Sequence, residues 1–79
     1  MTKKITRISV IGDGGWGTTL AVLLAGNGHD VTLWGAFPDY MEKIRRSRIN
    51  AKFLPGIKIP RSVVLTSDLK ASITAADVI

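Results

Sequence analysis

The sequence predicts an α/β fold in which parallel strands alternate with helices, and three observations support this prediction. Runs of β-branched and other apolar residues recur along the chain and alternate with segments whose apolar residues have helical spacing. Four of the eight glycines lie in one turn, after the first such run and before the first helical segment. The connections are short, so neighbouring strands are joined through helices and run parallel, with helices on both faces of the sheet.

The first half of the chain is predicted to form a strand, a helix and a second strand. Residues 5–11 end in a β-branched run that suits a strand covered on both faces. From Trp16 onward, leucines at i, i+3 and i+4 form the apolar stripe of a helix, and residues 26–28 supply the glycines that end it. Residues 30–34 are β-forming and should lie parallel to the first strand.

A second helix and an irregular connection are expected to follow. Residues 38–46 begin with Pro38, which suits a first helical turn, and they end in basic residues, which the helix dipole favours. Residues 50–61 contain Pro55-Gly56 and Pro60, so we expect no regular element there.

The last part of the chain is predicted to add a third strand, a short helix and the start of a fourth strand. Residues 62–66 offer the third strand, and Thr66 or Ser67 can cap the helix. One face of that helix would carry Leu69, Ile73 and Ala76. Residues 77–79 look like a strand that has just begun, so the sequence predicts a βαβαβα sheet truncated at the start of its fourth strand.

Composition limits the classes of protein that the chain can represent. Its 79 residues make at most one domain, and 46% hydrophobic with 22% charged residues indicates a packed globular chain. The lack of cysteine excludes disulfides, thiolate metal sites and a cysteine nucleophile, and we predict no metal site. No apolar run reaches the roughly 20 residues of a membrane span, so we expect a cytoplasmic protein with no membrane partner.

The net charge of +5 has two interpretations. Basic residues gather before the first strand and between residues 43 and 52, where they form either a solvated face or a surface that attracts a phosphorylated ligand. No DNA- or RNA-binding signature accompanies the charge, so we predict no nucleic-acid partner.

The glycine-rich turn carries the main functional signal. Gly12, Gly14 and Gly17 match G-x-G-x-x-G between a strand and a helix, which is the context of a dinucleotide-binding Rossmann fold. The first glycine permits the tight turn, the second lets the backbone approach a pyrophosphate, and the third lets the helix pack closely. Gly15 and Trp16 would direct their N–H groups at the phosphates. We therefore predict a Rossmann-like fold that binds NAD or NADP.

Two residues of the turn leave the binding mode open. Asp13 carries a negative charge that would repel a pyrophosphate unless its side chain points into solvent. Trp16 either packs in the core or faces the cofactor.

The end of the second strand bears on the choice of cofactor. NAD sites of this fold place an acidic residue there, whereas NADP sites prefer a nearby arginine. The chain has Gly35-Ala36-Phe37 at this position, which offers neither. Arg45 and Arg46 would reach a 2′-phosphate only if their helix turned them inward. The preference between NAD and NADP is therefore undecided.

Three stretches of the chain together resemble one family. They read VIGDGGWGTTLAVLLAGNGHDVTLWG, NAKFLPGIKIP and SDLKASITAADVI. In order and spacing they are similar to the N-terminal part of bacterial NAD(P)-dependent glycerol-3-phosphate dehydrogenase. The tryptophan before the last glycine of the turn, the LWG end of the second strand and the N-x-x-F/Y-L-P-G segment are jointly more specific than the glycine pattern alone.

The resemblance implies an oxidoreductase that transfers a hydride between the nicotinamide and C2 of glycerol 3-phosphate. This reaction interconverts glycerol 3-phosphate and dihydroxyacetone phosphate at the entrance to phospholipid synthesis. By resemblance, Gly15 and Trp16 match cofactor-contacting positions of the turn, and Ala36 and Phe37 match the pair that meets the adenosine ribose. Family members often have His or Arg in that pair, so the resemblance suggests ring packing by Phe37 instead of a 2′-phosphate contact.

The resemblance also implies what the chain lacks. The family's catalytic lysines and helical substrate domain come later in sequence than residue 79, so we assign no catalytic residue and interpret Lys52 and His29 as surface residues. Residues 1–79 are interpreted as an incomplete N-terminal dinucleotide-binding domain, inactive by itself. An incomplete parallel sheet leaves an open edge, so the alternative is a noncatalytic fragment that self-associates into a homo-oligomer.

Overall fold

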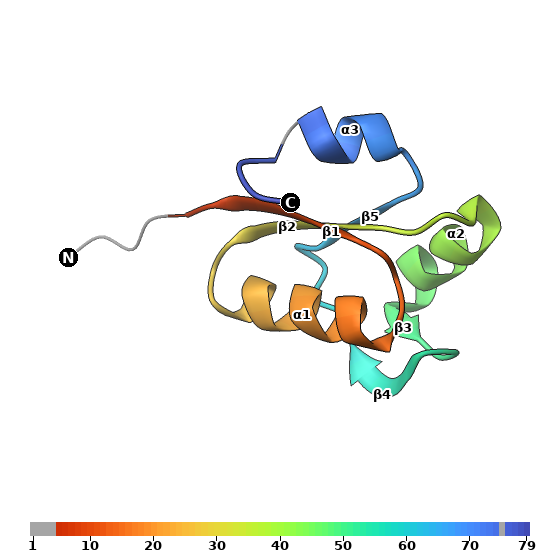
Figure 1. Ribbon diagram of the computed structural model, residues 1–79. Helices are drawn as coiled ribbons and strands as arrows, with labels where there is room; N and C mark the ends of the chain where they lie inside the picture. Colours follow the sequence, from red (N-terminus) through yellow and green to blue (C-terminus); the bar gives the residue numbers. More distant parts are fainter. Residues whose placement is uncertain (1–4, 75) are drawn as a thin grey trace.

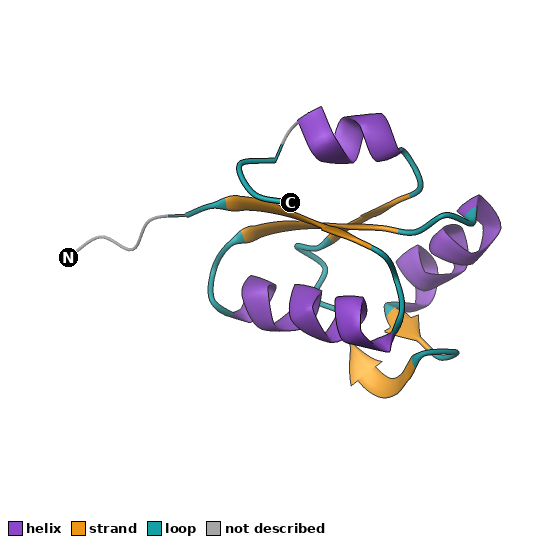
Figure 2. Cartoon of the chain, viewed as in Figure 1, coloured by secondary structure: helices purple, strands orange, loops and turns teal. Residues whose placement is uncertain are grey.

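The computed structural model describes residues 5–74 and 76–79 and confirms the predicted alternation of strands and helices (Figure 1). The elements in chain order are β1 (Arg7–Ile11), α1 (Gly15–Gly26), β2 (Asp30–Trp34), α2 (Pro38–Ser47), β3 (Ile49–Asn50), β4 (Leu54–Lys58), β5 (Val64–Thr66) and α3 (Leu69–Thr74). The main sheet has the order β1-β2-β5. Figure 2 shows α1 and α3 on opposite sides of this sheet, as the predicted fold class requires.

The central strand β2 pairs in parallel on both of its sides. Its pairing with β1 runs along the whole strand and ends where Ile11 lies opposite Trp34. On the other side Trp34 lies opposite Thr66 of β5. The carboxyl ends of all three strands therefore meet at one edge of the sheet, where the chain turns into α1 and α2.

Residues 77–79, which were predicted to begin a fourth strand, reach the outer side of β1. Ile8 forms a single parallel bridge with Val78. The Ser9 N–H donates to the Val78 carbonyl at 2.9 Å, and the Ser9 hydroxyl donates to the Ser72 carbonyl at 2.5 Å. The Arg7 carbonyl also accepts the N–H groups of Asp77 and Val78, so residues 77–78 bind the outer side of β1 along a short stretch.

The core lies between the sheet and the helices α1 and α2. Val31 and Leu33 of β2 are at most 2% exposed and form its centre. The other buried apolar side chains are Ala21, Met41, Ile44, Ile59, Val63 and Leu65. Burying a side chain of the size of leucine or isoleucine stabilises a fold by about 1.5–3 kcal/mol. This packing fixes α1 and α2 against the carboxyl end of β2.

The segment 50–61 is not irregular, so that prediction was wrong. β3 and β4 pair antiparallel with a register shift between Ile49 and Asn50. Pro55 lies inside β4 and Gly56 has a φ of +83°. A two-stranded ribbon has only edge strands, and edge strands tolerate a proline because one of their sides makes no ladder hydrogen bonds.

The predicted cap of α3 was also wrong. The Asp68 carboxylate accepts the Ala71 N–H at 3.0 Å, while the Thr66 hydroxyl accepts the N–H of Asp68 itself. Asp68 is the last residue before the helix, so its side chain reaches the third helical N–H. The predicted apolar face is not buried either, since Leu69 and Ile73 are 41% and 45% exposed and the small Ser72 makes the buried contact.

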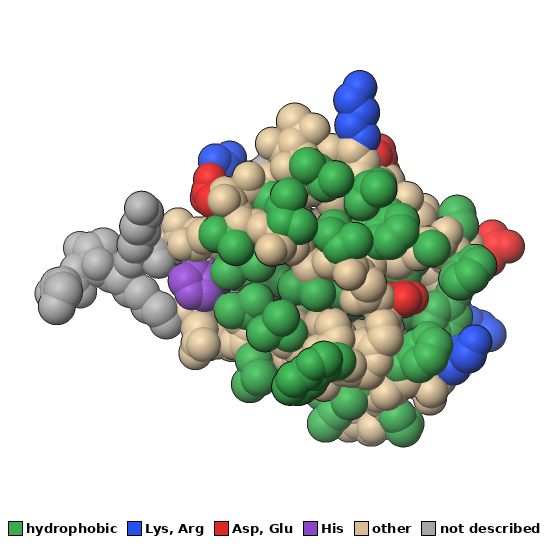
Figure 3. Space-filling model, viewed as in Figure 1, with side chains coloured by type: hydrophobic (Ala, Val, Ile, Leu, Met, Phe, Trp, Pro, Cys, Tyr) green, Lys and Arg blue, Asp and Glu red, His purple; other side chains and the backbone are tan. Residues whose placement is uncertain are grey.

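One face of the molecule carries exposed apolar side chains, which we call the apolar face: Ile11, Leu20, Leu23, Val78 and Ile79. Their exposed fractions range from 39% for Ile11 to 67% for Ile79. Figure 3 shows hydrophobic side chains gathered on the surface between α1 and α3. Four of these side chains, all but Leu23, also line a hollow of about 490 Å³.

In the part of the chain that the structure describes, every helix is too short or too polar to cross a bilayer.

Candidate functional site

The turn from β1 into α1, residues 12–17, is called the glycine turn below. Gly12 has a φ of +128°, a backbone conformation that L side chains rarely adopt. Its N–H donates to the Trp34 carbonyl at 2.8 Å, which fixes the start of the turn to the end of β2. The glycine turn thus lies at the carboxyl edge of a parallel sheet, where folds of this class bind ligands.

The other glycines of the turn differ in what surrounds them. A Cβ at Gly17 would lie 2.2 Å from the Gly12 carbonyl oxygen, so α1 can approach the turn only because that side chain is absent. A Cβ at Gly15 would lie 2.8 Å from the Phe53 carbonyl oxygen. A Cβ at Gly14 would meet no described atom within 4 Å, so this backbone faces open space that a ligand can enter.

The start of α1 offers N–H groups to that open space. Gly14 is the N-cap, and the first helical hydrogen bond runs from the Thr18 N–H to the Gly14 carbonyl at 2.9 Å. The N–H groups of Gly15, Trp16 and Gly17 precede this bond, so no carbonyl of the helix accepts them. They add to the partial positive charge of the helix end, which suits a phosphate or pyrophosphate group.

The buried side chain of Asn50 ties the glycine turn to the rest of the fold. Its amide nitrogen donates to the Asp13 carbonyl at 2.6 Å and to the Thr18 hydroxyl at 2.8 Å. Its carbonyl oxygen accepts the hydroxyl of Tyr40 and, at 3.4 Å, the N–H of Phe53. No local pattern indicated this role, and the only signal was the place of Asn50 at the start of the N-x-x-F/Y-L-P-G segment.

A pocket of about 290 Å³ lies beside the end of β2, lined by Asp13, Phe37, Tyr40, Lys52 and Phe53. Phe37 is 70% exposed, and Ala36 is exposed next to it. The rings of Tyr40 and Phe53 meet edge to face with their centroids 6.3 Å apart. The pocket therefore brings a carboxylate and aromatic rings together beside the glycine turn.

The Asp13 side chain is half-buried and turns one carboxylate oxygen away from solvent. Its Oδ2 atom is buried and has no hydrogen-bond partner among the described residues. A Cβ at Gly35 would lie only 2.8 Å from this oxygen. The carboxylate therefore rests against the end of β2, at the position where the sequence itself has no acidic residue.

Trp16 does not pack in the core. Its side chain is 87% exposed, and with Gly17, Leu20 and Leu23 it borders a shallow hollow of about 260 Å³. Of the two interpretations left open by the sequence, core packing is therefore excluded, and a contact with the cofactor stays a prediction.

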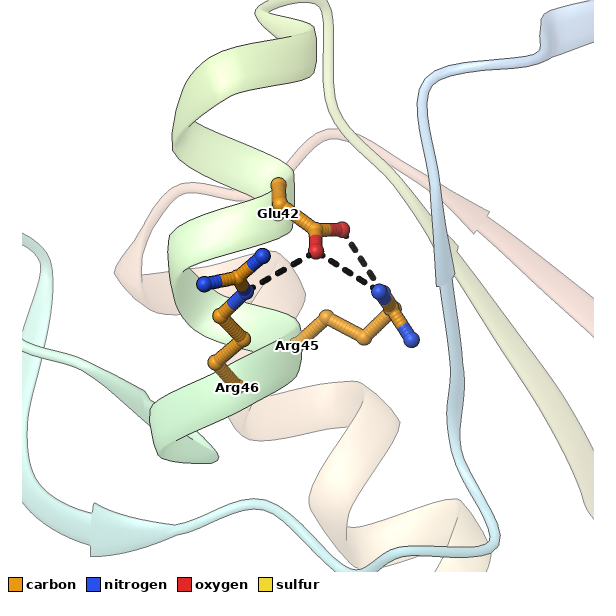
Figure 4. Close-up of polar contacts among 3 residues, drawn as sticks. All are labelled: Glu42, Arg45 and Arg46. Carbon is orange, nitrogen blue, oxygen red and sulfur yellow. Dashed lines mark hydrogen bonds and ion pairs between the residues drawn. The ribbon is translucent and has the colours of Figure 1, made fainter.

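Arg45 and Arg46 do not line the pocket at the end of β2. Both guanidinium groups bind the Glu42 carboxylate on the surface of α2, at 2.6 Å from Arg45 and 3.1 Å from Arg46 (Figure 4). The hydrogen bonds from Arg45 and then Arg46 lower the pKa of Glu42 to about 2. The inward orientation that a 2′-phosphate contact would need is not seen.

Comparisons with known proteins point to one family. Residues 7–79 match the family model described as NAD-dependent glycerol-3-phosphate dehydrogenase N-terminus. The chain is 49% identical over 72 residues to glycerol-3-phosphate dehydrogenase (NAD(P)+) of Prosthecochloris aestuarii, and 48% identical over 69 residues to the protein of the same name from Bacillus mycoides. These matches cover 91% and 87% of this chain.

A solved structure agrees with the sequence comparisons. The crystal structure of glycerol-3-phosphate dehydrogenase from Coxiella burnetii matches with a TM-score of 0.83 at 33% sequence identity, over 91% of this chain. The match covers 22% of that protein, and the two curated relatives are covered to 22% and 20%. The chain thus spans about a fifth of the length of the proteins it matches.

Proposed function

The chain belongs to the family of N-terminal regions of NAD-dependent glycerol-3-phosphate dehydrogenases, and from this premise we propose that it forms the dinucleotide-binding part of such an enzyme. The whole enzyme would interconvert glycerol 3-phosphate and dihydroxyacetone phosphate, a step that feeds phospholipid synthesis. The nicotinamide, when bound, supplies or accepts the hydride. The residues of this chain would hold the cofactor.

Each predicted site residue has a part in this proposal. Gly12 and Gly17 shape the turn, and the open side of Gly14 admits the pyrophosphate. The N–H groups of Gly15 and Trp16 would donate to it, since no helical carbonyl accepts them. Two further residues, Ala36 and Phe37, would border the adenosine, with the exposed Phe37 ring available for stacking on it.

The proposal also covers the organisation and setting of the protein. We assign residues 1–79 to an incomplete dinucleotide-binding domain, and substrate binding and catalysis to regions of the family that the match does not include. No catalytic residue is assigned to the described part of the chain. A cytoplasmic location without nucleic-acid or membrane partners fits a small-molecule dehydrogenase.

One observation carries the proposal: the open Gly14 backbone lies at the start of α1, which has no side-chain capping hydrogen bond, on the carboxyl edge of the sheet. Titration with NADH and with NADPH, followed by tryptophan fluorescence, tests it. Trp16 lies in the glycine turn and should report saturable binding, and Trp16→Phe should remove most of the signal while Trp34 remains. A lack of saturable change with both dinucleotides would contradict the proposal.

A second candidate function is self-association, which the apolar face favours. Four of its five side chains line one hollow with residues of β1, and Leu23 lines a second hollow together with Leu20. Exposed apolar patches of this kind mark interaction surfaces. Light scattering over a range of protein concentrations tests this candidate. A dimer or larger species that Leu23→Glu converts to monomer is expected, whereas a monomer at every concentration would rule it out.

A further inference from the structure

We propose that Asp13 replaces the acidic residue missing from the end of β2, binding the adenosine ribose hydroxyls and making the site selective for NAD(H) over NADP(H). This inference rests on the proposed function, since it concerns the same cofactor. It differs from the usual arrangement because the carboxylate comes from the glycine turn and not from the strand that normally supplies it.

The first support is the position of the carboxylate. The end of β2 reads Gly35-Ala36-Phe37 and has no acidic side chain. A Cβ at Gly35 would lie 2.3 Å from the Met41 sulfur and 2.8 Å from the Asp13 Oδ2. Glycine at this position therefore leaves room for a carboxylate that reaches the strand end from the neighbouring turn.

The second support is that this carboxylate has an unused acceptor. The Oδ2 atom of Asp13 is buried without a hydrogen-bond partner among the described residues, a condition that costs folding free energy and that native proteins rarely keep without a use. The backbone of Asp13 is held by Asn50 and Thr18 through its carbonyl oxygen. The last side-chain torsion of an aspartate is soft, so a small rotation can turn Oδ2 toward a donor in the pocket.

The third support is what surrounds the carboxylate. Asp13 and Phe37 line the same pocket of about 290 Å³. An adenosine offers two ribose hydroxyl donors for a carboxylate and a flat ring for an aromatic side chain. NADP carries a phosphate in place of the 2′-hydroxyl, so it loses that donor and brings a negative charge close to Asp13.

One cation lies in the same pocket and defines the competing outcome. Lys52 would attract a 2′-phosphate if its ammonium group faced the ribose. Its Nζ lies 5.2 Å from the centroid of the Phe53 ring, which is a cation–π arrangement. We therefore infer that the Lys52 ammonium group contacts the Phe53 ring. The substitution Lys52→Gln tests the alternative, in which this group binds a 2′-phosphate.

The experiment compares dissociation constants for NADH and NADPH, measured by fluorescence titration of the full chain. The wild-type protein should bind NADH more tightly by about tenfold or more, which corresponds to at least 1.4 kcal/mol. Asp13→Asn removes the charge at nearly constant shape, so it should weaken NADH binding, leave or improve NADPH binding and bring the ratio close to one. Asp39→Asn removes a negative charge from the exposed start of α2 and should leave the ratio unchanged.

Several results would overturn the inference. These are a wild-type preference for NADPH, an equal effect of Asp13→Asn on both affinities, or a loss of NADPH binding in Lys52→Gln with NADH unaffected. Circular dichroism and thermal melting verify folding, and Asp13→Ser provides a second variant if the asparagine variant does not fold. Saturable binding with an unchanged ratio rejects only the role of Asp13, whereas no binding of either dinucleotide rejects the proposed function with it.

Discussion

The Asn50 side-chain amide donates to the backbone carbonyl of Asp13 at 2.6 Å, across 37 positions of sequence. The same amide group accepts the Tyr40 hydroxyl, so a single buried residue joins the glycine turn, α2 and the β3–β4 ribbon. The backbone of the glycine turn is therefore positioned by a contact made inside the protein. If the turn binds a dinucleotide as proposed, it should need little reordering to do so.

Replacing Asn50 should weaken the fold. Asn50→Ala leaves the Asp13 carbonyl and the Tyr40 hydroxyl without this partner in a partly buried setting, so the free energy of unfolding should fall by about 2–3 kcal/mol. Urea denaturation measures the change. The matched control is Asn27→Ala at the exposed end of α1, where we expect less than about 0.5 kcal/mol. Equal losses in the two variants would show that the Asn50 contacts do not hold the turn.

A side chain at Gly14 should separate binding from stability. The added Cβ of Gly14→Ala meets open space, and the φ of −64° is ordinary, so the melting temperature should hardly change. The methyl group lies where the pyrophosphate is expected, so NADH affinity should fall by about tenfold or more. Gly26→Ala, at the other end of α1, should bind NADH like the wild type. Unchanged NADH affinity in Gly14→Ala would place the ligand elsewhere.

A side chain at Gly17, unlike one at Gly14, should lower the stability of the fold. Its Cβ would lie 2.2 Å from a backbone oxygen, which cannot rotate away as a side chain can. Gly17→Ala should therefore destabilise the protein by about 1–3 kcal/mol, the usual cost of overpacking. Thermal and urea unfolding of the Gly14 and Gly17 variants side by side measure this. Identical stability of the two would contradict the close packing of α1 on the turn.

Acid should release the ion pairs on α2. Arg45 and Arg46 lower the pKa of Glu42 from 4.5 to about 2 in the folded protein. Because the folded-state pKa is the lower one, the ionised carboxylate stabilises the fold above about pH 4.5, and this contribution is lost as the pH falls toward 2. As the pH falls from about 4.5 toward 2, the melting temperature of Glu42→Gln should therefore decrease less than that of the wild type.

Two comparisons check the assignment to Glu42. The difference between wild type and Glu42→Gln should shrink in high salt, since these side chains are exposed. Asp39 lies on the same helix but outside these arginine contacts. Asp39→Asn should therefore show the wild-type dependence of melting temperature on pH. A pH profile of Glu42→Gln that overlays the wild-type curve would show that the pairs add nothing to stability.

The fold could be predicted where local signals agree with one another. The β-branched strands, the helical spacing of leucines and the glycine turn indicate β1, α1 and β2 without any knowledge of tertiary contacts. The β3–β4 ribbon was missed because Pro55 and Gly56 usually interrupt regular structure, whereas an edge strand accommodates both. The Asp68 cap was displaced by one residue from the predicted Ser67, an error typical of element boundaries.

The candidate site was predictable only in its backbone. The spacing of Gly12, Gly14 and Gly17 indicates the turn and its likeness to a phosphate-binding loop. The role of Asn50 and the direction of the Asp13 carboxylate depend on contacts between segments far apart in sequence, and no local pattern encodes them. Such contacts arise from packing, which is why the side chains around the turn were found only in the structure.

The bridge between β1 and residues 77–79 has a consequence for how the protein is made. The Arg7 guanidinium meets the Asp77 carboxylate at 3.0 Å across 70 positions of sequence. At about 5–20 residues per second, a ribosome needs about 4–14 s to synthesise the chain between them. β1 is therefore made seconds before its outer partner, and until the two meet its unpaired backbone and apolar side chains can contact chaperones and other nascent chains.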